Sequence, residues 1–167
     1  RKDELHTAFN FPYLDSAWDA AAVRAVVDRT LVELKDVGAP ATWVLSNHDV
    51  TRHPTRFGGG DLGLRRAKAG TLLTLALPGG AYVYQGEELG LPEHTTMPDD
   101  VRQDPTWVRS EHEHRGRDGC RVPVPWVADA PSYGFGPTDA TWLPQPASAS
   151  AAVSSSAPTM PLAQRCA

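Results

Sequence analysis

The fold follows from one stretch, Thr42-Trp43-Val44-Leu45-Ser46-Asn47-His48-Asp49, in which a run of strand-forming residues ends in polar ones. The short run from Thr42 to Leu45 is typical of a parallel strand that is covered on both faces. In parallel α/β folds, residues that contact ligands lie at the carboxyl ends of the strands. We therefore expect the three polar side chains at the end of this stretch to lie at a functional edge of a parallel sheet.

The flanking sequence predicts helices and strands that alternate. Residues 5–11 alternate apolar and polar side chains and precede Pro12, which predicts a short strand. A helix follows, capped by Ser16 and ended by Gly38. Its apolar side chains recur at threes and fours: Ala17, Ala20, Val23, Val26, Val27, Leu31 and Leu34.

A second helix is expected after Asp61, and its inward side chains are predicted to be Leu64, Leu72, Leu75 and Ala76. The motif Pro78-Gly79-Gly80 ends this helix, and residues 81–84 then predict another buried strand. The order strand, helix, strand, helix, strand implies right-handed crossovers and a parallel sheet, so the fold class is α/β.

The sequence changes character after Gln85. Eleven of the 15 prolines lie beyond Glu88, and no helical or strand period persists. This predicts a long Pro/Gly-rich loop of the kind that is usually functional when ordered. Residues 147–167 contain seven Ala and five Ser with one charged side chain, so we expect this tail to be disordered.

Length and charge exclude several classes of protein. A complete (β/α)8 barrel needs roughly 200 residues or more, and this chain has 167 with a net charge of −4. Its basic residues are scattered and no apolar run spans a bilayer, so we expect neither nucleic acid nor a membrane as partner. The two cysteines predict no disulfide framework or metal site, which indicates a cytoplasmic location. We also expect no cofactor.

The same carboxyl edge should collect further polar side chains, since Gln85-Gly86-Glu87-Glu88 and Asn10 follow the other two predicted strands. Asn and Asp after a strand are often only turn formers or helix caps. The loop after Asp49 nevertheless carries Arg52, His53 and Arg56, which is more donors and acceptors than a simple turn requires.

Three ordered blocks resemble the α-amylase family, glycoside hydrolase family 13, in its α-glucosidase and oligo-1,6-glucosidase branch. Residues 43–49 resemble the Asn-His-Asp motif that closes the seventh barrel strand, residues 84–90 the segment at the eighth strand, and residues 116–126 a loop block of that branch. Residues 5–11 likewise resemble the stretch that leads out of the sixth strand. The resemblance covers residues 4–146 and implies a retaining hydrolase that removes terminal α-linked glucose from an oligosaccharide substrate.

The resemblance also implies roles for individual residues. Asp49 corresponds to the carboxylate that stabilises the positively charged transition state, a role that negative charge suits because the transition state resembles an oxocarbenium ion. His48 and Asn47 correspond to its substrate-binding neighbours. Arg121 corresponds to an arginine that clamps the terminal glucose, with Arg117 as the second candidate for this role.

The remaining polar and aromatic residues have plainer interpretations. Glu87 and Glu88 are expected to serve as structural hydrogen-bond partners. His112 and His114 are expected to be loop residues, because no third metal ligand lies near them. The two tryptophans Trp107 and Trp126 could stack on sugar rings or anchor the loop, and the Cys120 thiol is expected to be packed.

Two carboxyl groups of the family's site have no counterpart here. The resemblance implies a nucleophilic Asp at the fourth strand and an acid Glu at the fifth, and neither motif occurs in the chain. Residues 1–146 are therefore expected to be the C-terminal part of a catalytic (β/α)8 TIM barrel, about strands six to eight with their helices. The chain alone should be inactive and expose unpaired strand edges. A trehalose synthase, a sucrose isomerase and a non-catalytic interaction domain remain alternatives, and the sequence does not indicate an oligomeric state.

Overall fold

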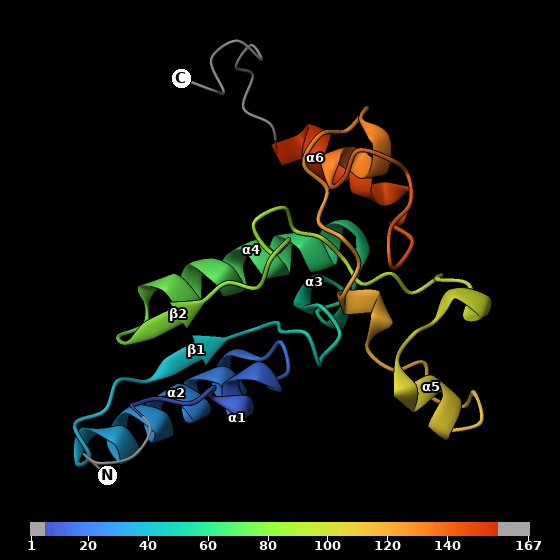
Figure 1. Cartoon of the computed structure of the whole chain (residues 1–167). Coiled ribbons are helices and arrows are strands. Elements are labelled where there is room, and N and C mark those ends of the chain that lie inside the picture. The colour runs from blue at the N-terminus through green and yellow to red at the C-terminus, as the bar shows by residue number, and fades with distance from the viewer. Residues whose placement is uncertain (1–5, 157–167) are drawn as a thin grey trace. The chain divides into compact units, whose positions relative to one another are not determined.

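The computed structural model describes residues 6–156, which divide into two compact units between Glu93 and His94. The first unit holds two strands that pair in parallel, with Trp43 opposite Ala81 (Figure 1). Its elements in chain order are α1 (Phe11–Leu14), α2 (Ala20–Lys35), β1 (Thr42–Val44), α3 (His53–Arg56), α4 (Gly60–Ala76) and β2 (Gly80–Tyr82). The expected β-α-β crossover is therefore present between β1 and β2.

The core of the first unit forms where α2 packs on the sheet. Trp43 is fully buried, and its ring meets the Tyr13 ring edge to face at 5.2 Å between centroids. Five residues of the predicted apolar stripe pack against this cluster: Val23, Val26, Val27, Leu31 and Leu34. The helix begins later than predicted, because Asp19 rather than Ser16 caps it: the Asp19 carboxylate accepts from the Ala22 N–H at 2.8 Å.

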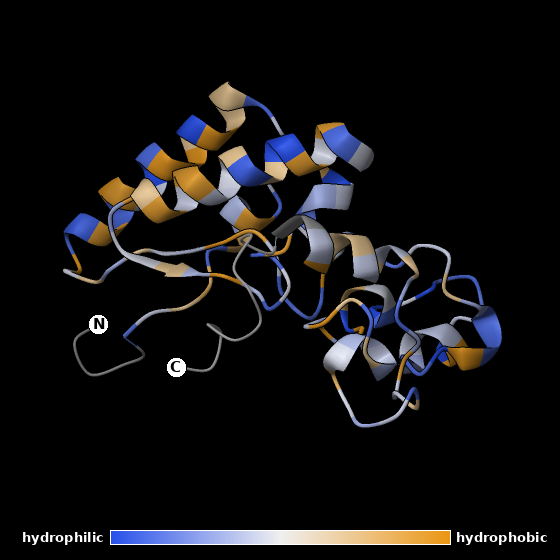
Figure 2. Cartoon of the chain, turned by 90° about the horizontal axis from the view of Figure 1, so that it is seen from above, coloured by the Kyte–Doolittle hydropathy of each residue, from blue (hydrophilic) through white to orange (hydrophobic). Residues whose placement is uncertain are grey.

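The second long helix packs through small residues, which corrects the prediction for its leucines. The buried positions on α4 are Gly63, Ala67, Gly70 and Thr74. Leu72 and Leu75 are instead 69% and 58% exposed. The buried face packs closely on its neighbours, because a Cβ on Gly63 would lie 2.1 Å from the Pro54 carbonyl oxygen of α3 and one on Gly70 would lie 3.1 Å from Leu45 Cδ1, and the two leucines lie outside this face. Figure 2 shows apolar and polar residues mixed along the two long helices.

Two of the three predicted strands differ from expectation. Residues 7–10 run beside β1, where the Asn10 N–H donates to the Thr42 carbonyl at 3.1 Å, but they form no ladder, and Phe11 already begins α1. A proline in the first turn of α1 favours this early helix. The strand β2 is exposed rather than buried, because within residues 6–156 its only strand neighbour is β1.

The second unit consists mostly of loops, as expected, with short helices among them. They are η1 (Asp99–Val101), α5 (Pro105–Arg109), η2 (Asp118–Cys120), η3 (Pro131–Gly134) and α6 (Ser148–Ser156). Residues 148–156, predicted to be disordered, thus form a helix in which Ala149 is fully buried. Burial of this small side chain explains the difference, since it gives the Ala/Ser segment packing that composition does not reveal. Residues 157–167 lie outside the described part of the chain.

Candidate active site

The loop that follows β1 carries the three residues predicted from the sequence. Asn47 is buried, and its side-chain oxygen accepts from the Asp49 backbone N–H at 2.8 Å, which forms a tight Asx turn. This turn leaves His48 and Asp49 exposed, with 3.4 Å between His48 Nε2 and Asp49 Oδ2. The structure therefore brings all three together at the carboxyl end of a buried parallel strand. An exposed carboxylate beside an imidazole can accept hydrogen bonds from hydroxyl groups and stabilise a nearby positive charge.

The charged residues beyond the turn have structural roles instead of facing a ligand. Arg52 is only 1% exposed, and its Nη1 donates to the Gln85 carbonyl at 2.8 Å. Its backbone N–H donates to Glu93 Oε2 at 3.0 Å, and its guanidinium lies 4.7 Å from the centroid of the Tyr84 ring. Arg52 thus joins the loop after β1 to the loop after β2. The sequence predicts more hydrogen-bond donors in this loop than a turn requires, and Arg52 is one of them. In the fold, its hydrogen bonds are made to other residues of the chain.

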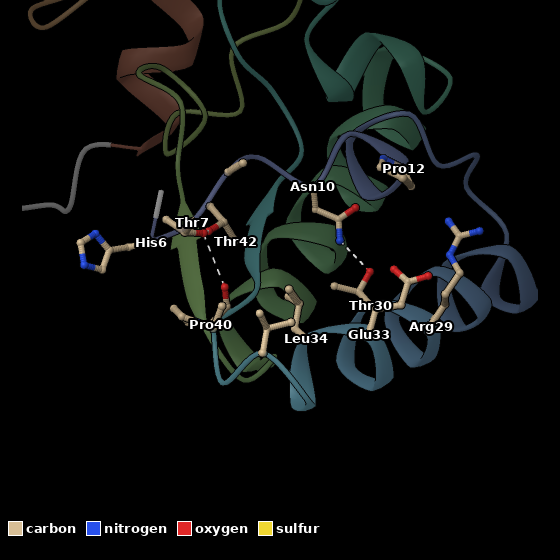
Figure 3. A pocket seen from close by; sticks show the side chains of 13 residues that line it. His6, Thr7, Asn10, Pro12, Arg29, Thr30, Glu33, Leu34, Pro40 and Thr42 are labelled. Carbon is tan, nitrogen blue, oxygen red and sulfur yellow. Dashed lines mark hydrogen bonds between the residues drawn. The ribbon is translucent and has the colours of Figure 1, made fainter. Parts of the chain in front are cut away.

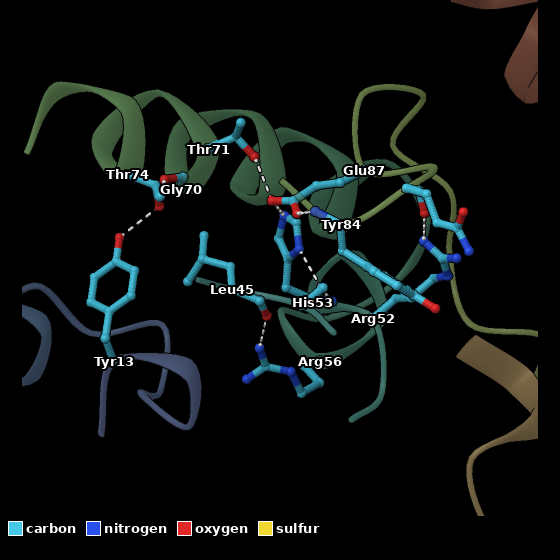
Figure 4. A network of polar contacts seen from close by, with 12 residues as sticks. Tyr13, Leu45, Arg52, His53, Arg56, Gly70, Thr71, Thr74, Tyr84 and Glu87 are labelled. Carbon is cyan, nitrogen blue, oxygen red and sulfur yellow. Dashed lines mark hydrogen bonds and ion pairs between the residues drawn. The ribbon is translucent and has the colours of Figure 1, made fainter. Parts of the chain in front are cut away.

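Glu87 has the structural role that was expected. Its side chain is 3% exposed and accepts from the Tyr84 N–H at 2.9 Å and from the Thr71 hydroxyl at 3.2 Å. Burial raises the pKa of the Glu87 carboxyl, while these hydrogen bonds act in the opposite direction. Its Oε1 also lies 3.7 Å from Nε2 of the buried His53 (Figure 4). This pairing of His53 with Glu87 could not be found from local sequence patterns, because the two residues are far apart in the chain.

Asn10 does not reach the predicted edge, which corrects the expectation for this residue. Its side-chain oxygen caps α1 by accepting from the Tyr13 N–H at 3.0 Å, and its amide donates to the Thr30 hydroxyl at 2.8 Å. Asn10 thereby lines a cavity of about 360 Å³ between residues 6–12 and α2 (Figure 3). This cavity contains none of the residues assigned to the substrate.

The two candidate arginines lie in the second unit and differ in their contacts. Arg117 donates from Nε to Asp104 Oδ2 at 2.7 Å and from its backbone N–H to the same oxygen at 2.9 Å. Burial raises the pKa of the Asp104 carboxyl, but the hydrogen bonds from Arg117 and Thr106 outweigh burial and hold this pKa well below its usual value. Arg121 is half-buried, and its backbone N–H donates to the Asp118 carbonyl at 3.0 Å. A large part of the Arg117 side chain therefore serves the loop itself.

The aromatic and sulfur side chains of the long loop mostly anchor it. Trp107 stacks on His112 with 4.6 Å between ring centroids, so this histidine is a loop residue. Trp126 is 62% exposed, unlike a buried anchor. Cys120 is buried as expected, and its thiol donates to the Arg117 carbonyl at 3.1 Å.

Two searches of the described residues concern ligands and membranes. Over residues 6–156, no three His, Cys, Asp or Glu side chains cluster as a metal site would require. In the same part of the chain, no helix combines the length and the apolar composition needed to cross a bilayer.

The chain belongs to the α-amylase family, since residues 4–157 match the family described as Alpha amylase, catalytic domain, which is a TIM barrel. A probable alpha-glucosidase of Rhizobium meliloti (strain 1021) is 37% identical over 149 residues, which cover 85% of this chain and 25% of the relative. Maltase A1 of Drosophila melanogaster is 35% identical over 147 residues, or 83% of this chain and 24% of the relative. The chain therefore spans about a quarter of the length of these curated relatives.

Solved structures agree with this family. The alpha-glucosyl transfer enzyme XgtA is 38% identical with a TM-score of 0.73, and the match covers 89% of this chain and 27% of that one. The trehalulose synthase MutB from Pseudomonas mesoacidophila MX-45 has a TM-score of 0.72 at 23% identity, covering 90% of this chain and 32% of its own. The second likeness shows a shared fold.

Proposed function

We propose that these residues are part of an α-glucosidase-type glycoside hydrolase that removes terminal α-linked glucose from oligosaccharides with retention of configuration. One observation carries the proposal. The exposed Asp49 carboxylate lies 3.4 Å from the His48 imidazole, directly after the buried parallel strand β1. The identity of more than a third to an alpha-glucosidase supports the assignment to glucosides.

The chemistry of glycoside cleavage suits this pair. The transition state resembles an oxocarbenium ion, so a fixed negative charge near the sugar ring lowers its free energy. We assign that role to Asp49. His48 would bind a ring hydroxyl, because a neutral imidazole can donate or accept a hydrogen bond, and the amide of the buried Asn47 would hold the turn that presents both.

Within the family's barrel, we propose that the chain supplies about strands six to eight. Residues 7–10 would be the sixth strand, β1 the seventh and β2 the eighth. The nucleophile and the acid, which must lie about 5 to 5.5 Å apart in a retaining enzyme, have no matching motif in these 167 residues. The proposal assigns both to other parts of the polypeptide, so the 167 residues alone should be inactive.

Arg121 is the proposed clamp for the terminal glucose. The competing candidate, Arg117, has its Nε bound to the buried Asp104 at 2.7 Å. Both arginines are candidates for this role, and Arg121 stands first because its place in the loop block, residues 116–126, corresponds by resemblance to that of the family's clamping arginine.

Glucosyl transfer is a second candidate, and the 38% identity to an alpha-glucosyl transfer enzyme favours it specifically. Both reactions pass through a glycosyl-enzyme intermediate, and they differ in whether water or a sugar hydroxyl accepts the glucose. Chromatography of the products formed from maltose separates the two outcomes. Free glucose alone indicates hydrolysis, and new di- or trisaccharides indicate transfer.

The test is the variant Asp49→Asn in the full-length polypeptide that contains these residues. We expect kcat on p-nitrophenyl α-glucoside to fall by at least about 100-fold, because the amide keeps the shape and removes the charge. The matched control is Asp36→Asn, which neutralises an exposed carboxylate at the end of α2 and should leave kcat unchanged. Equal kcat for Asp49→Asn and the wild type would refute the role of Asp49. Absence of turnover in the wild type would favour a non-catalytic interaction domain, and turnover by the 167 residues alone would refute their predicted inactivity.

A further inference from the structure

Three buried side chains, those of Ser46, His53 and Glu87, form a row that begins at the residue before the Asn47–Asp49 turn; His53 and Glu87 are labelled in Figure 4. Ser46 Oγ is 2.8 Å from His53 Nδ1, and His53 Nε2 is 3.7 Å from Glu87 Oε1. Ser46, His53 and Glu87 are 2%, 1% and 8% exposed. The row therefore connects the carboxyl end of β1 to the carboxyl end of β2 through the first residue of α3.

Two hydrogen bonds join Ser46 to His53. The His53 backbone N–H donates to Ser46 Oγ at 3.0 Å, and the same hydroxyl forms a second hydrogen bond with ring Nδ1, in which either atom can be the donor. The other ring nitrogen, Nε2, lies 3.7 Å from Glu87 Oε1 without a hydrogen bond. The ring is neutral because burial, together with the Arg56 and Arg52 charges, lowers the pKa of His53 to about 4, although an interaction with the Ala67 backbone acts in the opposite direction.

Glu87 is itself held at a defined position. Its Oε2 accepts from the Tyr84 N–H directly after β2, and its Oε1 accepts from the Thr71 hydroxyl on α4. The carboxylate therefore has little freedom to move, and the imidazole between it and Ser46 is confined from both sides. Hydrogen bonds between buried polar groups, as between His53 and Ser46, hold a local structure in one arrangement.

The row acts on the residues that carry the proposed chemistry. Ser46 precedes Asn47, and the Asn47 side chain in turn accepts from the Asp49 N–H at 2.8 Å. This hydrogen bond ties the Asp49 backbone to the buried Asn47, so the position from which the Asp49 carboxylate extends depends on the buried residues before it. A carboxylate that stabilises a developing charge must be held close to its productive position, and a displacement of about 1 Å can lower a rate about 100-fold.

We propose that His53 is a positioning residue for Asp49, because its imidazole and backbone N–H both hydrogen-bond the Ser46 hydroxyl at the end of β1 and so orient the turn that presents the carboxylate. This inference rests on the proposed function, since only a catalytic Asp49 needs such positioning.

Two substitutions of the same residue separate the two contacts of the ring. In His53→Asn, the amide oxygen takes the place of Nδ1 and can accept from Ser46, while the contact with Glu87 is lost. In His53→Gln, the amide nitrogen takes the place of Nε2 and can donate to Glu87, while the contact with Ser46 is lost. Both variants lose the ring contact with Phe57, where the centroids are 5.6 Å apart, so they are matched in lost packing.

The measurements are kcat, KM and the thermal midpoint of the full-length polypeptide. We expect His53→Gln to lower kcat at least about tenfold with KM nearly unchanged, and the conservative variant His53→Asn to retain most of the kcat. Ser46→Ala removes the same contact with minimal loss of packing and should match His53→Gln. Phe57→Leu is the control, since it removes the ring contact with His53 and weakens the same core but keeps the hydrogen bonds between His53 and Ser46, and it should lower only the thermal midpoint.

The outcomes distinguish this inference from the proposed function. If Asp49→Asn loses activity while His53→Gln and Ser46→Ala keep the wild-type kcat, the positioning role is overturned and the proposed function stands. Equal losses in His53→Gln and His53→Asn overturn it as well, because they indicate general destabilisation. If Asp49→Asn keeps full activity, the proposed function and the inference both fail.

Discussion

The contact between α3 and α4 provides a sharp test, because it holds the segment that carries His53. Gly63 lies at this contact, and a Cβ added there would lie 2.1 Å from the Pro54 carbonyl oxygen and 3.2 Å from its carbon. Both are backbone atoms, which cannot rotate away as a side chain does. Gly63→Ala therefore forces the two helices apart by about 1 Å, the difference from an ordinary contact.

The magnitude follows from two opposing contributions. Alanine in place of glycine inside a helix stabilises it by about 1 kcal/mol. Overpacking of a tight contact costs about 1 to 3 kcal/mol, and a clash with backbone belongs at the upper end of that range. We expect Gly63→Ala to lower the free energy of unfolding by about 2 kcal/mol.

Gly70→Ala is the matched control on the same helix. Its added Cβ would meet the Leu45 Cδ1 atom at 3.1 Å and the Phe57 ring at 3.5 Å, which are ends of side chains that can adjust. We expect the stability of this variant to be unchanged or raised by up to about 1 kcal/mol. Urea unfolding of the full-length polypeptide, followed by tryptophan fluorescence, measures both variants. If Gly63→Ala proves as stable as Gly70→Ala, the packing argument is wrong.

Two further predictions concern pH and the arginines. Burial lowers the pKa of His53 from 6.5 to about 4 in the folded protein. The neutral imidazole therefore favours the folded state above pH 6.5, and this contribution is lost as pH falls towards 4. Between about pH 7 and about pH 5, the free energy of unfolding should fall by about 2 kcal/mol through this residue. Urea titrations at both pH values should show that His53→Asn removes most of this change, and an undiminished change would contradict it. Arg121→Ala should weaken inhibition by glucose, whereas Arg117→Ala should mainly lower the thermal midpoint by removing the guanidinium that pairs with the buried Asp104 carboxylate; the reverse pattern would transfer the clamp to Arg117.

The elements that the sequence predicted well are those with a strong local pattern. The buried strand β1 and the helix α2 follow from strand-forming residues and from an apolar period of threes and fours. The inward face of α4 could not be predicted in this way, because leucines ordinarily indicate a core. Here the close approach of α3 selects glycine and alanine, and hydrophobicity carries no signal for such a contact.

The candidate site was likewise predicted only in part from the sequence. Asn47, His48 and Asp49 are adjacent in the chain, so their shared position at the end of β1 is visible without a structure. The buried partners of that loop are not, because Glu87 and Glu93 meet His53 and Arg52 only through folding. Local sequence therefore indicates the three residues of the turn and a structural role for Glu87, but not which distant residues pair in the fold.

The family, the β-α-β crossover and the tripeptide at its carboxyl edge could all be predicted from the sequence, because each depends on a pattern of residues that are close together in the chain. The burial of Arg52 and His53 and the pairing of Arg117 with a buried carboxylate are seen only in the folded structure. A polar side chain has the same hydrogen-bonding groups whether it faces water or is buried. Its role depends on which distant groups replace its hydrogen bonds to water, and chain folding alone brings those groups together.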